Sequence, residues 1–493
     1  MLFRVAVTAH LGVDEPGERG CAYRGNVQMT FLRKIPLCFF VAALALAASR
    51  TEAQQAMPPE VSEPSVQLER PGGAAQGPVT VTLSDAIGRA RTVDAGYLSS
   101  VSDARNAHDD SLQARNSMLP SVDATSQYLG TEGNGKTPIG RFVTNDGVHV
   151  YRAWGVLHED LSPTTYLSTD YHHAQAAEAL AKAKGEIAQR GLTVTVTKNY
   201  YGLVAAQRDY AFAQAALDQA RHFLKITQDA EASGLAAHAD VLKARIAAEQ
   251  EQQAFDEAGL AMENARLDLA VLLFPALNEN FTVVDDLDTA APLPDFGDMQ
   301  EMAAKGDPEL RVAMDTLSEA NSDVTAARGA FLPSFSLEAD YGIEANAFAL
   351  RSVNVEFPED GPLPNLGYFI TAGVTIPVWD WGTLRSKLRQ SETNLDQARA
   401  GANQTQREAL ANLYSAYNEA KVARADVSSS QQAADDASES LRLTQLRYQA
   451  GESSAQEVVD AQNTLTQART AFDGAQVRYR VALARLQTFT GPF

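Results

Sequence analysis

The sequence has few cysteines, a deficit of basic side chains and no long apolar run beyond its N-terminus. Its 493 residues contain two cysteines, and 41 Lys and Arg stand against 62 Asp and Glu, which gives a formal net charge of −21. Sequence-nonspecific nucleic-acid binding needs a surplus of Lys and Arg to replace phosphate counterions, so this class of function is disfavoured. Because no run of about 20 apolar residues follows the N-terminal region, a membrane protein built from several spanning helices is excluded.

The first 53 residues have the pattern of an export signal. Met29 begins a short basic stretch, and an apolar run from Leu37 to Ala48 follows, which is too short to span a bilayer as a helix. We expect a signal peptide over residues 29–53 and expect residues 1–28 to lie upstream of the true start. Both cysteines leave with this segment, so the exported chain is expected to have no disulfide and no Cys-ligated metal.

The remainder of the chain contains an internal repeat. Residues 114–121 resemble residues 327–334, and residues 224–228 resemble residues 441–445, in the same order. A Pro/Gly/Ala-rich stretch comes before the first copy, and a proline-containing stretch separates the two. We therefore predict a flexible leader, a first repeat, a linker and a second repeat, at residues 54–80, 81–273, 274–297 and 298–490.

Both halves have the spacing of long coiled-coil helices. Apolar residues recur at alternating steps of three and four from Val458 to Phe489, and the same register runs from Val241 to Leu272. A second long helical stretch is predicted before each of these ladders, over about 164–232 and 382–449. A continuous helix of that length would reach roughly 100 Å at 1.5 Å per residue, which no compact globular domain needs.

Between the helices, the pattern changes to strict alternation. Residues 334–344 and 368–376 alternate apolar and polar side chains over about ten residues, which is typical of a transmembrane β-strand. A weaker pair lies near 121–130 and 148–158, and there we interpret Arg152 as interrupting the apolar face.

Four strands cannot close a barrel, and an open sheet edge cannot face lipid. We therefore predict a mainly α fold with a small β part: duplicated long-helix coiled coils and two β-hairpins. Three copies would combine into a homotrimer, with a 12-stranded transmembrane β-barrel on a 12-helix α-barrel.

Short motifs occur in a fixed order along this plan. Leu-Pro-Ser stands at the start of the first strand of each half, at 119–121 and 332–334, and Ile376–Gly382 follows the last strand. Ser233–Leu235 and Arg447–Gly451 lie between the paired long helices. With these motifs, the chain resembles the outer-membrane efflux proteins, the TolC-like channels, over about residues 81–490.

This resemblance implies a bacterial outer-membrane channel whose helical barrel lies in the periplasm. Its partners would be outer-membrane lipid, a periplasmic adaptor protein and an inner-membrane pump. The resemblance places the adaptor-contacting helical tips and a gate hydrogen bond on particular residues. The tips would be at Gly234, Leu235, Gly451 and Glu452, and the gate bond would join Tyr448 to Asp240. The alternative for Tyr448 is simple packing against a neighbouring helix.

Glu457 and Asp460 match the positions of the family's acidic ring at the pore constriction. They are three residues apart, so they share one helix face, and in a trimer they would form rings of three carboxylates that attract cations. The alternative is that both are ordinary solvated charges. Trp379 and Trp381 are expected in an aromatic girdle at the membrane interface rather than in a core.

The predicted function is a passive exit duct of a tripartite export system for small toxic molecules, drugs or metals. A type I protein secretion duct would have the same appearance, and a periplasmic or surface structural coiled-coil protein is an alternative of a different class. The helical hairpins also leave a periplasmic adaptor open, although adaptors usually carry one hairpin. No nucleophile elbow, phosphate loop or zinc motif is present, so we expect no enzyme, no cofactor and no metal site.

Overall fold

The computed structural model describes residues 79–131, 148–234, 237–277, 280–289, 292–345, 347–353, 359 and 361–492. All of them belong to one compact unit of the chain. The expected signal region and most of the expected leader, residues 1–78, lie outside the described residues.

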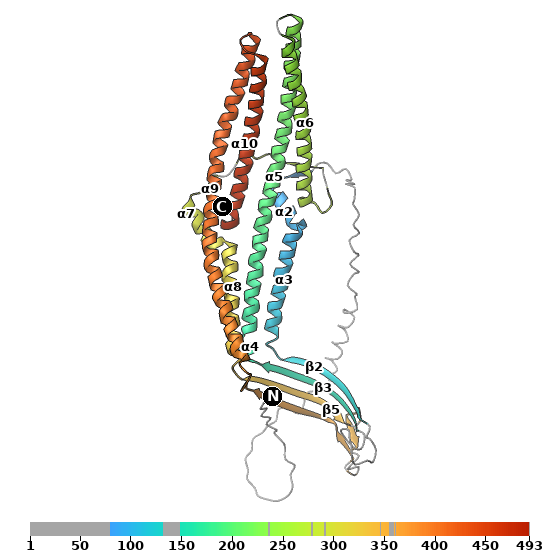
Figure 1. Cartoon of the computed structure of the whole chain (residues 1–493). Coiled ribbons are helices and arrows are strands. Elements are labelled where there is room, and N and C mark those ends of the chain that lie inside the picture. The colour runs from blue at the N-terminus through green and yellow to red at the C-terminus, as the bar shows by residue number, and fades with distance from the viewer. Residues whose placement is uncertain are drawn as a thin grey trace. The chain divides into compact units, whose positions relative to one another are not determined.

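The two halves of the chain repeat the same order of elements, two helices, two main strands and two helices (Figure 1). A short helix, α4 (Pro163–Tyr166), is added in the first half. The other first-half elements are α2 (Leu83–Val93), α3 (Ala95–Asn116), β2 (Ser121–Thr131), β3 (Val148–Leu161), α5 (Thr169–Ala232) and α6 (His238–Leu273). The second-half elements are α7 (Phe296–Gly306), α8 (Pro308–Gly329), β5 (Ser334–Ala345), β8 (Leu366–Thr375), α9 (Thr383–Gln449) and α10 (Ala455–Thr490).

Small strands supplement this plan. β1 (Val79–Val81) pairs in parallel with β4 (Phe281–Val283), and β6 (Arg351–Val353) pairs with β7 (Pro362–Pro364). β1 begins inside the expected leader and β4 lies inside the expected linker. The β1–β4 pair packs with Tyr200, Tyr201 and Leu269 in the largest buried cluster, so the linker is anchored to the first half.

The long helices agree with the heptad pattern. α9 has 67 residues and α5 has 64, so α9 runs about 100 Å. The predicted helix over 164–232 is interrupted, because Ser168 adopts a left-handed conformation with φ 53° between α4 and α5. Buried alanines such as Ala420 and Ala423 allow α9 and α10 to approach closely.

The long helices pack side by side in a fixed order. α6 packs on α5, α5 on α10 and α10 on α9, while α3 packs on α5, α5 on α8 and α8 on α9. The helices α3, α6 and α9 therefore lie at the edges of this arrangement (Figure 1). None of the helices in the described residues combines the length and the apolarity that a bilayer-spanning helix needs.

The main strands form one antiparallel sheet in the order β2-β3-β5-β8. Its register corrects the expectation for Arg152, which pairs with Gln127 on one side and with Glu344 on the other. Directly opposed residues share a face, so Arg152 lies on the polar face and does not interrupt the apolar one. The apolar face of β3 is carried by the alternate residues, among them Tyr151 and Leu157.

Candidate channel site: sheet faces, interface tryptophans and helical tips

The four-stranded sheet separates apolar from polar side chains. One face carries large hydrophobic residues that are exposed in the single chain, including Tyr368 at 76% and Ile370 at 61%. The register places Tyr341 opposite Tyr368 and Ala339 opposite Ile370, so the apolar strip continues across strands. In water such a strip is unfavourable, and hydrocarbon would be its natural surroundings.

The opposite face of the sheet carries polar and charged side chains that pair across strands. Arg152 lies 2.7 Å from Glu344, and His158 lies 3.8 Å from Glu338. Trp154 is also on this face, and its ring N–H donates to the carbonyl of Ile343 at 2.8 Å. A face of this kind requires water, so the sheet has the two-sided character of a barrel wall.

Trp379 and Trp381 lie just after β8, in the turn that leads into α9. Both side chains are exposed, at 67% and 77%, and their ring centroids are 5.6 Å apart in an edge-on arrangement. Asp380 fixes the turn by accepting from the backbone N–H groups of Gly382 and Leu384, and these bonds lower the pKa of Asp380. Trp381 and Gly382 adopt left-handed backbone angles, φ 58° and 84°. The turn therefore holds two large rings outward at the end of a strand.

The turn between α9 and α10 is a glycine-terminated cap. Gly451 has φ 78°, its N–H donates to Tyr448 O at 2.9 Å, and the N–H of Glu452 donates to Arg447 O at 2.8 Å. These two bonds form a Schellman motif, which needs a left-handed residue at the glycine position. Gly234 follows the end of α5 with φ 72°, and its N–H donates to Glu231 O at 2.9 Å. Leu235 lies outside the described residues.

Glu457 and Asp460 are both exposed on the first turns of α10. The Glu457 carboxylate accepts from the N–H and the hydroxyl of Ser454, each at 3.2 Å, in a capping box, and lies 4.0 Å from Arg447. Asp460 accepts from Gln456 at 2.8 Å. Glu457 thus has a local role in starting the helix, and the proposed acidic ring stays a prediction.

Within one chain, Tyr448 is engaged with α5. Its hydroxyl lies 3.5 Å from the Thr227 hydroxyl, and its ring packs edge-on against Phe223 at 5.0 Å between centroids. The carboxylate of Asp240 lies 4.0 Å from the Lys243 ammonium. Tyr448 therefore joins the two hairpin tips through α5, and the expected bond to Asp240 stays a prediction.

The second half of the chain matches a known protein family. Residues 300–492 match the family model described as outer membrane efflux protein. Over these residues the chain is similar to the outer membrane efflux proteins.

Known relatives extend the match into the first half. Outer membrane protein OprJ of Pseudomonas aeruginosa is 25% identical over 315 residues, which cover 64% of this chain and 60% of that protein. The pyoverdine export outer membrane protein OpmQ of the same organism is 26% identical over 327 residues, covering 65% of this chain and 64% of that protein. The chain thus spans less than two thirds of the length of the relatives it matches.

Solved structures share the fold. The MtrE outer membrane channel of Neisseria gonorrhoeae, in its open state, superposes with a TM-score of 0.69 at 20% identity, over 83% of this chain and 88% of that one. A membrane protein from Pseudomonas aeruginosa gives 0.71 at 19% identity, over 86% and 99%. The CmeC channel of Campylobacter jejuni gives 0.69 at 19%, over 83% and 85%. These likenesses confirm the predicted fold class, a mainly helical chain with a small β part.

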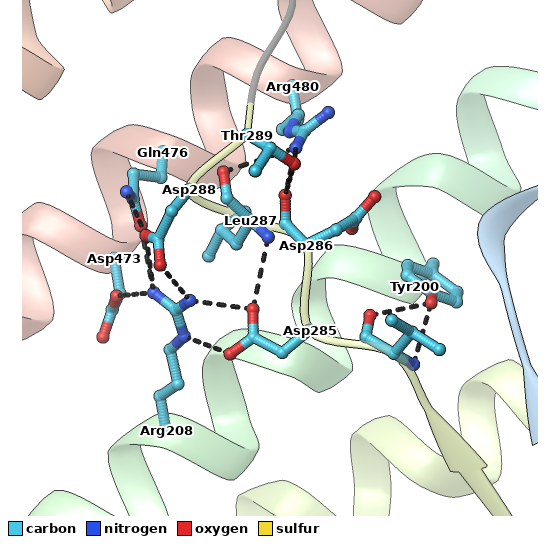
Figure 2. A network of polar contacts seen from close by, with 11 residues as sticks. Tyr200, Arg208, Asp285, Asp286, Leu287, Asp288, Thr289, Asp473, Gln476 and Arg480 are labelled. Atoms are coloured by element: carbon cyan, nitrogen blue, oxygen red, sulfur yellow. Dashed lines mark hydrogen bonds and ion pairs between the residues drawn. The ribbon is translucent and has the colours of Figure 1, made fainter.

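The sequence analysis did not predict one network of paired polar residues. Figure 2 shows Arg208 of α5 surrounded by Asp285 and Asp288 of the linker and by Asp473 of α10. Burial raises the pKa of Asp473, while hydrogen bonds from Arg208 and Gln476 lower that of Asp288. The signal in the sequence is the group of three aspartates, Asp285, Asp286 and Asp288, within the predicted linker.

Proposed function

We propose that three copies of this chain form a passive exit duct through the bacterial outer membrane, with the long helices in the periplasm. The observation that carries the proposal is the open four-stranded sheet with one apolar and one charged face. Its edge strands β2 and β8 have no partner on their outer sides within the described residues. Unpaired edges are not tolerated in lipid, so the sheet must be completed by other copies.

The strand directions favour closure by identical neighbours. Because the sheet has four alternating strands, β8 of one copy would meet β2 of the next in antiparallel orientation, and the alternation would continue around the ring. The edge helices support the same arrangement. Leu242, Ile246 and Leu260 on α6 and Leu443 and Leu446 on α9 are exposed in the single chain and would be covered by a neighbouring copy.

The duct would work with a periplasmic adaptor protein that contacts the tips near Gly234 and Gly451 and with an inner-membrane pump. Among its relatives, the name pyoverdine export outer membrane protein favours a small molecule over a protein as the cargo. The carboxylates of Glu457 and Asp460 would then ring the periplasmic mouth and favour cations there.

The first test is native mass spectrometry of the protein extracted from outer membranes with detergent, followed by recordings in planar lipid bilayers. We expect trimers and discrete conductance steps. A monomer that is released without detergent and forms no channels would overturn the proposal in favour of the structural coiled coil.

Crosslinking in cells, from photoreactive residues placed at Gly234 and Gly451, would then test the partners. We expect crosslinks to an adaptor, and recovery of the associated pump would assign the cargo. A proton-driven pump would support drugs or metals, whereas an ATP-driven secretion pump would replace that cargo with protein.

A further inference from the structure

The linker between the two halves passes between the two helical hairpins, α5–α6 and α9–α10, and is bonded to both. Arg480 of α10 donates to the carbonyls of Asp286 and Leu287 and lies 3.4 Å from the Thr289 hydroxyl. Asp288 accepts from Gln476 of α10 at 2.8 Å. Toward α5, the Tyr200 hydroxyl accepts from the N–H of Val284 at 3.0 Å.

Arg208 is the centre of this arrangement (Figure 2). Its guanidinium binds Asp285 through two bonds of 2.7 and 2.8 Å, and Asp288 through bonds of 3.0 and 3.3 Å. The same group donates to Asp473 at 3.0 Å and to Gln476 at 3.2 Å, both on α10. One side chain of the first hairpin thus holds the linker and the second hairpin together. We call Arg208 with its four partners the clamp.

The clamp is shielded from water where it meets α10, whereas the side chains of Asp285 and Asp288 in the linker are 45% and 65% exposed. The side chain of Asp473 is 4% exposed and that of Arg208 is 19% exposed. Buried, charge-assisted bonds of a planar guanidinium depend strongly on geometry, and removing one partner leaves a charge without compensation. The contact therefore fixes how α5 and α10 lie against each other at this level.

Toward the tips, the hydrogen bonds between the two hairpins are longer than the bonds of the clamp to α10. Asp209 accepts from Thr470 at 3.3 Å, and Tyr448 reaches Thr227 at only 3.5 Å near the tip. Apolar side chains of the two hairpins also gather there, in a buried cluster that contains Phe223 and Val458. Apolar contacts have no preferred direction and permit sliding, whereas the clamp does not.

Arg208 lies far from the tips, so a movement of the helices at its level is amplified there. It lies 24 residues before the end of α5 at Ala232, which corresponds to about 36 Å along the helix. A small rotation at that level therefore becomes a large displacement at the tips.

We propose that Arg208 is a positioning residue that joins the two hairpins and serves as the pivot about which the tips separate when the periplasmic mouth opens. The inference rests on the proposed function, because it takes the tips to be the mouth of a duct. Rotation of α10 against α5 at this level would distort the bonds of the clamp, so weakening the clamp would lower the cost of opening without altering any residue at the mouth.

The test is the substitution Arg208→Lys, which keeps the positive charge but removes the planar guanidinium that binds several carboxylates at once. The matched control is Arg442→Lys, because Arg442 also binds a carboxylate through two bonds, to Glu439, but within α9 alone. Asp473→Asn is a second, nearly isosteric variant that weakens the clamp if Arg208→Lys does not fold.

We expect Arg208→Lys to increase the open fraction in single-channel recordings by about tenfold, a size typical of mutations that alter coupling between distant sites. Hydrogen exchange at residues 220–232 and 447–460 should rise in the same variant. Asp473→Asn should act in the same direction to a smaller extent, and Arg442→Lys should match the unmodified protein in both measurements.

Two results separate this inference from the proposed function. If the unmodified protein conducts and Arg208→Lys leaves both the open fraction and tip exchange unchanged, the clamp is not a pivot and the duct stands. If the unmodified protein forms no channels, the duct fails, and increased tip exchange in Arg208→Lys alone would still show that the clamp couples the hairpins.

Discussion

Placing a charge on the apolar face of the sheet tests most directly whether this face meets lipid. Ile370 lies in the middle of β8, is 61% exposed in the single chain and stands opposite Ala339 of the apolar face. We propose the substitution Ile370→Arg. The neighbouring residue, Thr371, provides the matched control Thr371→Arg, because it points to the opposite face and pairs with Glu338.

The expected loss of stability depends on how deep in the bilayer the substituted residue lies. An arginine at the midplane of a barrel's lipid face costs about 2 to 4 kcal/mol, so a trimer with three such sites would lose about 6 to 12 kcal/mol. On the lumen face the arginine stays in water beside a carboxylate, and a change within about 1 kcal/mol is expected.

Two measurements can detect this difference in stability between the two variants. Unfolding by guanidinium chloride in lipid vesicles can be followed by the fluorescence of the exposed Trp379 and Trp381, and trimer yield can be quantified after detergent extraction. We expect a lower midpoint and little trimer for Ile370→Arg, and values near those of the unmodified protein for Thr371→Arg. Equal losses in the two variants, or a larger loss in Thr371→Arg, would refute the assignment of the sheet faces.

Three further predictions concern the tips, the mouth and the response to acid. Gly451→Ala should destabilise the protein by about 1 kcal/mol because alanine resists φ 78°, whereas Gly401→Ala, in an open position within α9, should be neutral or stabilising in the same thermal unfolding assay. Replacing Glu457 and Asp460 by their amides should reduce the cation preference of the conductance in a salt gradient; an unchanged preference would argue against the acidic ring. Hydrogen bonds from a lysine one turn away and from side chains of α3 lower the pKa of Glu178 to about 2 from 4.5. These hydrogen bonds contribute about 1 kcal/mol to the free energy of unfolding above pH 4.5, and this contribution is lost as pH falls toward 2. Glu178→Gln should therefore make the free energy of unfolding depend less on pH in this acid range.

The sequence by itself determined the elements and their order, because these depend on local patterns. Alternating steps of three and four between Val458 and Phe489 require a helix with one apolar seam, and the period of two in residues 334–344 requires a two-faced strand. The left-handed glycines at the tips, Gly234 and Gly451, are likewise local features, since they end helices where no other residue fits as well.

The tertiary structure decided which side chains meet across distant segments. Arg152 was expected to interrupt an apolar face, and pairing with Glu344 places it on the polar one, because the weak alternation of β3 does not by itself show which face is apolar. Arg208 and Asp473 are 265 residues apart in the sequence, and only packing of α5 against α10 brings them together at 3.0 Å. Periodicity fixes the direction of a side chain relative to its own helix, but the partner it reaches depends on how the helices are packed.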